Sequence, residues 1–220
     1  MSIDEQLEPV PPPDAEVLWQ QANGLVGQGD LSSAAPLYRQ LSEIWPDQAP
    51  VWCNLGLVLR ALQRFEEARP CLLRSLDLEP DNALAHYELG QLAEQLNKPD
   101  DATENYLMAT WLDPSYLDAW NSLADAALQR GDLTGAGGYL ETVLQIDPAN
   151  VPGNFLRGNL ARQQNDEEAA ARHFTIAYEI ASDPFCGNSL AGALANSGRL
   201  DEAIELLRDL VRKQPDFATA

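Results

Sequence analysis

Apolar residues along most of the chain recur at intervals of three and four positions, in blocks that come in pairs. This spacing places the apolar side chains on one face of an α-helix, so each block predicts an amphipathic helix. Short breaks separate the two blocks of each pair: Gly29-Asp30, Gln63-Arg64, Asn97-Lys98-Pro99, Gly131-Asp132, Asn165-Asp166 and Gly198-Arg199. Glycine and asparagine accept the left-handed backbone that closes a helix. The pattern therefore predicts a series of helical hairpins.

The hairpins follow a fixed period. Alanines recur every 34 residues, with a last interval of 33, at Ala34, Ala68, Ala102, Ala136, Ala170 and Ala203. Prolines keep nearly the same interval and are expected to end the second helix of each pair at Pro46, Pro80, Pro114, Pro148 and Pro215. Such a period indicates one supersecondary unit repeated along the chain. The predicted units are 15–48, 49–82, 83–116, 117–150, 151–183 and 184–217.

The two ends of the chain lie outside these units. Residues 1–14 are acidic and contain Pro9, Pro11, Pro12 and Pro13, so we expect a disordered leader there. Residues 218–220 are expected to be a tail or the start of a seventh unit.

The repeated residues resemble the tetratricopeptide repeat, in which an aromatic residue is followed by Leu-Gly, an alanine, a second aromatic, another alanine and a proline. Units two and four match at Trp52, Leu55-Gly56, Ala68, Pro80, Trp120, Leu123-Ala124, Ala136 and Pro148. Unit one departs at Leu18 and Gln21-Ala22, and unit five departs with Asn154 in the aromatic place and Pro184 arriving late. The pattern therefore predicts the array but not the stacking angle at these two units. The resemblance covers 15–217 and implies an all-α fold, an α-solenoid in which tandem hairpins form a right-handed superhelix.

Charge and cysteine usage narrow the classes of function. The chain carries 34 acidic and 14 basic residues, a net charge of −20, which repels nucleic acid and anionic membranes. A neutral to basic protein partner fits this charge, and so does a role in solubility alone. Three cysteines without a C-x-x-C motif, and no secretory signal or long apolar run, predict a reducing, cytoplasmic location and no membrane partner.

Candidate chemistry is sparse, so we expect no enzyme activity, no metal and no cofactor. His86 occupies the slot of Trp52 and Trp120 and is expected to be a packing residue. His173 has no cysteine or carboxylate at metal-ligand spacing. The glycines from Gly135 to Gly138 lie inside a predicted helix and do not form a phosphate loop. Paired acids at the starts of second helices complement the helix dipole.

The resemblance further implies a concave groove lined by the first helix of each unit. Carried over to this chain, the candidate partner-binding residues are Trp19, Asn23, Asn54, Arg60, Tyr87, Glu88, Gln91, Asp118, Asn121, Asp125, Phe155, Asn159 and Arg162, and Phe185 lies on the same face in unit six. Asparagine and glutamine both donate and accept hydrogen bonds, which suits the backbone of an extended peptide. Trp19 and Phe155 fit either the groove or the core between helices.

One function of similar proteins can be tested on these residues. Members that hold the acidic C-termini of heat-shock chaperones use lysines, asparagines and an arginine on their first helices. Asn23 and Asn54 match two of these places, but Trp19 and Leu84 stand where lysines are needed and Glu88 where arginine is needed. A carboxylate-binding clamp is therefore not predicted.

Three functions remain open at this point. The first is a non-catalytic scaffold that binds a protein or peptide in the groove. The second is the substrate-recognition part of a larger enzyme, such as a glycosyltransferase or a methyltransferase, which a reading frame continuing past Ala220 would support. The third is self-association through the last helix, where Ile204 and Val211 would lie on a bare stacking face.

Overall fold

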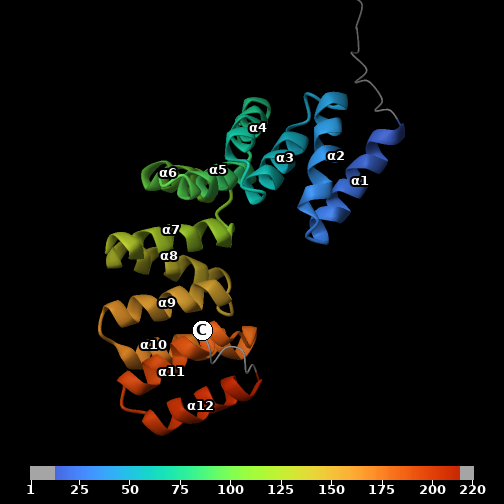
Figure 1. The fold of residues 1–220 in the computed structure, drawn as a ribbon. Helices are drawn as coiled ribbons and strands as arrows, with labels where there is room; N and C mark the ends of the chain where they lie inside the picture. The colour runs from blue at the N-terminus through green and yellow to red at the C-terminus, as the bar shows by residue number, and fades with distance from the viewer. Residues whose placement is uncertain (1–12, 214–220) are drawn as a thin grey trace, which may run out of the picture. The chain divides into compact units, whose positions relative to one another are not determined.

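The computed structural model describes residues 13–213 of the chain, and within them all regular secondary structure is α-helical. The chain divides into an N-terminal unit, 1–114, and a C-terminal unit, 115–220. In the N-terminal unit, three hairpins pack side by side (Figure 1). Their helices are α1 (Pro13–Gly27), α2 (Leu31–Ile44), α3 (Ala49–Ala61), α4 (Phe65–Leu78), α5 (Ala83–Gln95) and α6 (Pro99–Leu112).

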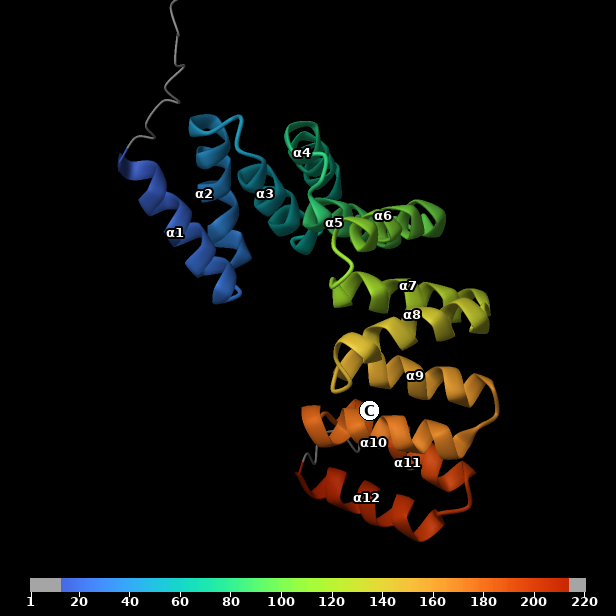
Figure 2. The same cartoon turned by 180° about the vertical axis from the view of Figure 1, so that it is seen from behind.

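The C-terminal unit repeats this arrangement, and its helices lie as successive layers in both views (Figures 1 and 2). Its helices are α7 (Leu117–Arg130), α8 (Leu133–Ile146), α9 (Val151–Gln163), α10 (Glu167–Ala181), α11 (Pro184–Asn196) and α12 (Leu200–Lys213). Odd-numbered helices are the first, and even-numbered helices the second, of each hairpin. The predicted hairpins are therefore present throughout the described residues.

Helix α1 begins earlier than the sequence predicts. Pro13 and Asp14, which we expected in a disordered leader, are the first two residues of this helix. Proline is tolerated in the first turn because its missing N–H would have no partner inside the helix there. The rest of the predicted leader, 1–12, and the predicted tail, 218–220, lie outside the described residues.

The break inside every hairpin has the same backbone geometry. One residue in each of these breaks has a positive φ: Gly29 (79°), Gln63 (60°), Asn97 (56°), Gly131 (75°), Asn165 (62°) and Gly198 (86°). In each case the N–H of the next residue donates to a carbonyl five positions earlier, as Asp30 does to Leu25 at 2.9 Å and Arg64 to Leu59 at 2.8 Å. This pattern closes the first helix and turns the chain into the second.

Small residues let the two helices of a hairpin approach closely. The six periodic alanines are all 3% exposed or less. A Cβ atom added at Gly90 would lie 2.4 Å from the Tyr106 ring, and one added at Gly158 would lie 2.5 Å from the Phe174 ring. Side chains of the second helix therefore fill the space that a glycine of the first helix leaves open.

Overpacking one of these alanines is expected to destabilise the N-terminal unit. Ala102 is 1% exposed on α6, so Ala102→Leu should lower the free energy of unfolding by about 1–3 kcal/mol. Urea denaturation followed by tryptophan fluorescence measures this loss. As a control, Ala61→Leu at the exposed end of α3 should change stability by less than about 0.5 kcal/mol. Equal effects of the two changes would contradict the placement of Ala102.

Helix α8 carries glycines that no packing requires. An added Cβ at Gly138 meets nothing within 4 Å, and the residue lies in the helix interior. Gly138→Ala should therefore stabilise the C-terminal unit by about 0.5–1 kcal/mol, because alanine loses less backbone entropy on folding. The contrasting variant is Gly131→Ala, which should lower the stability of this unit because Gly131 has a φ of 75°, a backbone conformation that alanine disfavours. Calorimetry measures whether the melting temperature rises for Gly138→Ala and falls for Gly131→Ala. A lower melting temperature for Gly138→Ala would contradict this prediction.

The junction between α10 and α11 differs from the other junctions. Only Ser182 and Asp183 separate these helices, whereas four residues separate α8 from α9. Ser182 adopts a left-handed backbone with φ of 52°, and the Asp183 side chain accepts from the Cys186 N–H at the start of α11. Helix α11 packs against α10 more extensively than α9 packs against α8. The shorter interval of 33 residues therefore comes with closer packing of α11 on α10.

Candidate functional site

In the N-terminal unit, two predicted groove residues meet at a tyrosine of the second helix. The Tyr38 hydroxyl donates to Asn23 Oδ1 at 2.5 Å and accepts from Asn54 Nδ2 at 3.4 Å. Tyr38 is 1% exposed, and this burial raises its pKa above the ordinary value. The tyrosine thus joins α1 to α3 and orients both asparagines. The sequence contains a sign of this bridging role, because the 34-residue repeat places a tyrosine at the same position in repeats one (Tyr38) and three (Tyr106).

Tyr106 plays a corresponding part for α5. Its hydroxyl accepts from Gln91 Nε2 at 2.9 Å, and its ring lies 5.7 Å from that of Tyr87. Gln91 and Tyr87 are both half-buried. Two more predicted groove residues are therefore held in place from the second helix.

Glu88 does not lie on the surface where the sequence places it. It is 3% exposed and accepts from Arg60 Nε at 2.6 Å, across from α3 to α5. The Arg60 side chain is itself only 14% exposed. The prediction that Glu88 contacts a partner in the groove is therefore wrong, because this carboxylate is buried and pairs with Arg60 inside the unit.

The Glu88 carboxylate also affects the pKa of a neighbouring cysteine, Cys53. Burial, with the charge of Glu88 nearby, raises the pKa of Cys53 to about 12. A thiol with this pKa stays protonated near neutral pH and is a poor nucleophile. All three cysteines, Cys53, Cys71 and Cys186, are buried and free of disulfides.

Trp19 packs between helices. Its ring contacts Tyr38 edge-on at 5.9 Å and Trp45 at 6.5 Å. The side chain belongs to the partly buried layer around the core of the N-terminal unit. Of its two possible roles, the packing role is the one that the structure supports.

In the C-terminal unit, an aromatic cluster reaches the surface of the first helices. The Phe155 ring on α9 lies 5.3 Å from Phe174 on α10 and 5.2 Å from Phe185 on α11. Phe174 is fully buried, whereas Phe185 is 60% exposed. Arg162 places its guanidinium 4.8 Å from the centre of the Phe174 ring. Phe155 is therefore half-buried against the core and supports an exposed aromatic residue of the next repeat.

Asn121 is also buried, at 7% exposure, so it does not offer its side chain to a partner as the sequence predicts. Its Nδ2 donates to Asn150 Oδ1 at 3.1 Å, which also accepts from the Gly153 N–H at the start of α9. The side chain thus ties α7 to the beginning of α9. Glycine at 153 is needed there, because an added Cβ would lie 2.5 Å from Val143.

The remaining predicted groove residues stay at least partly accessible. Asp118 and Arg162 are exposed, and Asn159 is half-buried. Asp125 is half-buried and accepts from Gln129 Nε2 at 2.7 Å. The accessible first-helix positions among the predicted residues of this unit are therefore polar.

The two histidines form the same kind of pair in different repeats. Asn105 Nδ2 donates to the Asp101 carbonyl, so its Oδ1 faces His86 Nδ1 at 3.3 Å as an acceptor. In repeat five the partners exchange helices: Asn154 Oδ1 lies on the first helix and faces His173 Nδ1 of the second at 3.1 Å. Both histidines are therefore packing residues with a satisfied Nδ1–H. Within residues 13–213, no group of three or more potential ligands could hold a metal ion.

The His173 pair predicts a pH dependence. Burial, with Arg157 and Arg172 nearby, lowers the pKa of His173 below its ordinary value. The unfolded chain therefore binds this proton more readily, and the stability that the neutral imidazole contributes is present above about pH 6.5 and lost as pH falls towards the folded pKa. Urea denaturation between pH 7 and 5 should show a steeper loss for the native chain than for His173→Gln. Parallel slopes would contradict this assignment.

The comparisons with known proteins agree with this geometry. The family model described as "Tetratricopeptide repeat" matches residues 20–70, 53–110 and 96–151. This chain belongs to the tetratricopeptide repeat family. It is similar in structure to PilW, titled a type IV pilus biogenesis factor, with a TM-score of 0.81 at 17% identity over 93% of this chain and 96% of that one. The predicted class, an all-α solenoid of tandem repeats, is thereby confirmed.

Curated relatives share the repeats at low identity. The human "Protein O-mannosyl-transferase TMTC3" is 26% identical over 94% of this chain and 23% of its own length. "Anaphase-promoting complex subunit 7" of Arabidopsis thaliana is 26% identical over 91% of this chain and 36% of its own length. This tetratricopeptide repeat chain thus spans about a quarter to a third of the length of both relatives. None of the helices described here has the length and apolar character needed to cross a membrane.

Proposed function

We propose that this chain is a non-catalytic scaffold that binds an extended segment of a partner protein on the first helices of its repeats. The observation that carries the proposal is the Phe185 ring, which is 60% exposed yet held by Phe155 at 5.2 Å. An exposed aromatic residue that is held in place by its neighbours is typical of the anchors that dominate binding energy at interfaces. Family membership supports the same role, because repeats of this kind present concave binding surfaces.

The charge of the chain supports a neutral to basic partner. Asp118 is exposed and Asp125 half-buried on α7, and the whole chain has a net charge of −20. Such a field attracts cationic segments and raises their rate of association. The proposal includes no nucleic acid, membrane, metal or cofactor, and it places the protein in the cytoplasm, where its three free cysteines suit a reducing environment.

Random peptides displayed on phage can test this function without knowledge of the partner. Peptides selected on the full chain should combine an apolar residue with Lys or Arg, and Phe185→Ala should weaken their binding at least about tenfold. Trp111→Ala is the matched control, because Trp111 is 73% exposed but lies on a second helix, α6. Peptides that tolerate Phe185→Ala, or that lose affinity equally with Trp111→Ala, would contradict the proposal.

A second candidate is the substrate-recognition part of a larger enzyme. The similarity to a human O-mannosyl-transferase favours it, since 94% of this chain aligns with only 23% of that protein. Sequencing the gene beyond the codon for Ala220 separates the two candidates. A continuing frame that encodes a transferase domain would favour the second candidate, and the Phe185 surface would then bind the substrate of that enzyme.

A further inference from the structure

Helix α12 carries an apolar stripe that no described residue covers. Four residues at intervals of four, three and four positions share one face, and their exposed fractions are 58% for Leu200, 46% for Ile204, 39% for Leu207 and 43% for Val211. Ala203 and Leu210, each 3% exposed, lie on the side that packs against α11. The most buried residues of α12 thus lie on a different face of the helix from the stripe.

The preceding repeats show what this face does elsewhere. The residues that correspond to Leu207 in the first five repeats are 1% exposed or less: Tyr38, Leu72, Tyr106, Leu140 and Phe174. In α12 the same place remains 39% exposed. The stripe is therefore a stacking face without a partner among residues 13–213.

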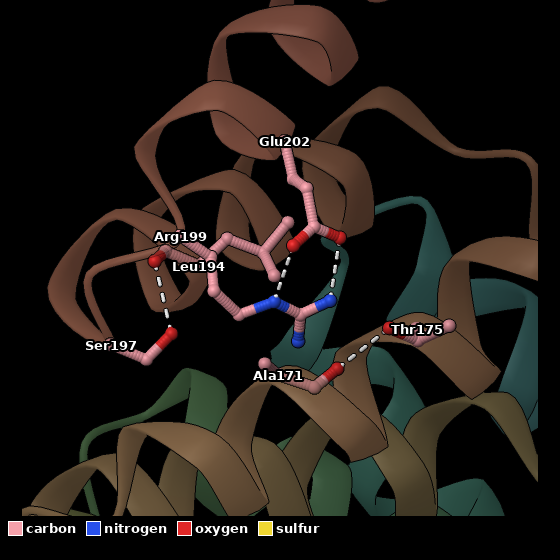
Figure 3. A network of polar contacts seen from close by, with 6 residues as sticks. All are labelled: Ala171, Thr175, Leu194, Ser197, Arg199 and Glu202. Carbon is pink, nitrogen blue, oxygen red and sulfur yellow. Dashed lines mark hydrogen bonds and ion pairs between the residues drawn. The ribbon is translucent and has the colours of Figure 1, made fainter.

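A row of charges runs directly beside the stripe. Each apolar residue is followed by a charged one, in the order Asp201, Glu205, Arg208 and Arg212. The other charges of α12 pair close by, Glu202 with Arg199 at 2.6 Å (Figure 3) and Asp209 with Lys213 at 2.7 Å. None of the four flanking charges takes part in an ion pair within the described part of the chain.

The stripe and the charges together form a self-complementary pattern. The apolar spacing reads the same in both directions, whereas the charges change from acidic to basic at the centre. A twofold axis across the helix brings each half of such a pattern against the opposite half of an identical helix. A parallel arrangement would instead place like charges side by side.

We propose that α12 pairs in antiparallel orientation with α12 of a second copy of this chain. Leu200 then contacts Val211 of the second copy, and Ile204 contacts its Leu207. Asp201 faces Arg212 across the axis, and Glu205 faces Arg208. The two helix dipoles run in opposite directions, which adds to the attraction.

The local charge permits this contact despite the acidity of the chain. Residues 199–213 contain four basic and four acidic side chains, so this segment is neutral in a chain whose net charge is −20. Two copies that approach through α12 therefore meet less repulsion than they would through other surfaces. The proposal is independent of peptide binding at Phe185, which lies on α11.

Sedimentation equilibrium of the full chain across a dilution series tests the pairing. The mass should rise with concentration from 24.1 kDa for one chain towards twice that value. Ile204→Glu with Leu207→Glu should keep the chain monomeric, whereas the control Ile180→Glu, at another exposed apolar residue on α10, should leave dimerisation unchanged. Circular dichroism verifies that every variant retains its helices.

Charge reversal distinguishes binding of a second copy of this chain from binding of any other protein segment to the α12 stripe. Asp201→Arg with Glu205→Arg, and separately Arg208→Glu with Arg212→Glu, should each abolish self-association. The first variant then carries four basic residues along the stripe, and the second carries four acidic residues. Each variant paired with itself places like charges opposite each other, whereas an equal mixture of the two should form a heterodimer in which four basic groups face four acidic groups. A native chain that stays monomeric at every concentration, or a mixture that stays monomeric, would overturn the proposal.

Discussion

Glu88→Ala is expected to lower the free energy of unfolding by about 3–5 kcal/mol. The substitution leaves Arg60, whose side chain is 14% exposed, without the carboxylate that accepts from its Nε at 2.6 Å. A charge left unpaired inside a protein loses most of its hydration and gains nothing in return. Urea denaturation followed by tryptophan fluorescence measures the loss well, because four of the five tryptophans lie in 1–114.

A paired substitution separates the charge from the volume of the side chain. Arg60→Met combined with Glu88→Leu removes both charges and keeps apolar bulk, so the double variant should be close to the native chain in stability or above it. The coupling free energy between positions 60 and 88, measured by a double-mutant cycle, should therefore be large. If Glu88→Ala cost less than about 1 kcal/mol, or the double variant were the least stable of the set, the buried ion pair would not exist as described.

Phe174→Ala is expected to destabilise the C-terminal unit by about 3–5 kcal/mol. The ring is fully buried, fills the space beside Gly158 and contacts Phe155 at 5.3 Å. Its removal leaves a cavity and takes away the support of Phe155, on which Phe185 packs. Binding of selected peptides at Phe185 should weaken as well, although Phe174 itself is not on the surface.

Hydrogen exchange measured by mass spectrometry locates this loss. Amides of α9, α10 and α11 should exchange faster in Phe174→Ala, while those of the N-terminal unit should change little because repeats contact only their neighbours. Phe174→Leu is the matched control and should lose less, since it keeps most of the apolar volume. Unchanged exchange in α9–α11 would contradict the role given to this ring.

Periodic features of the fold could be predicted from the sequence because they depend on local backbone chemistry and spacing. Gly29, Asn97 and Asn165 have the left-handed backbone that their residue types favour, and the periodic alanines are buried as their interval implies. Pro13 was the exception at the N-terminus. Proline opposes a helix in its interior but not in its first turn, and the sequence alone does not decide which of the two applies.

The candidate site was less predictable because side-chain pairing depends on contacts between repeats. Glu88 and Asn121 occupy first-helix positions as the family resemblance implies, yet both are buried, because Glu88 pairs with Arg60 of the preceding repeat and Asn121 with Asn150 at the start of α9. Phe155 and Trp19 are half-buried because aromatic residues of neighbouring helices lie within reach. Phe185 became the leading candidate only once its exposure and its contact with Phe155 were known.

Binding on the first helices is the central claim, and hydrogen exchange of the native chain with and without a selected peptide tests it most directly. The account predicts that the peptide protects amides of α9 and α11 around Phe155 and Phe185, and leaves α6 around Trp111 unchanged. Protection confined to second helices, with α9 and α11 unaffected, would contradict it.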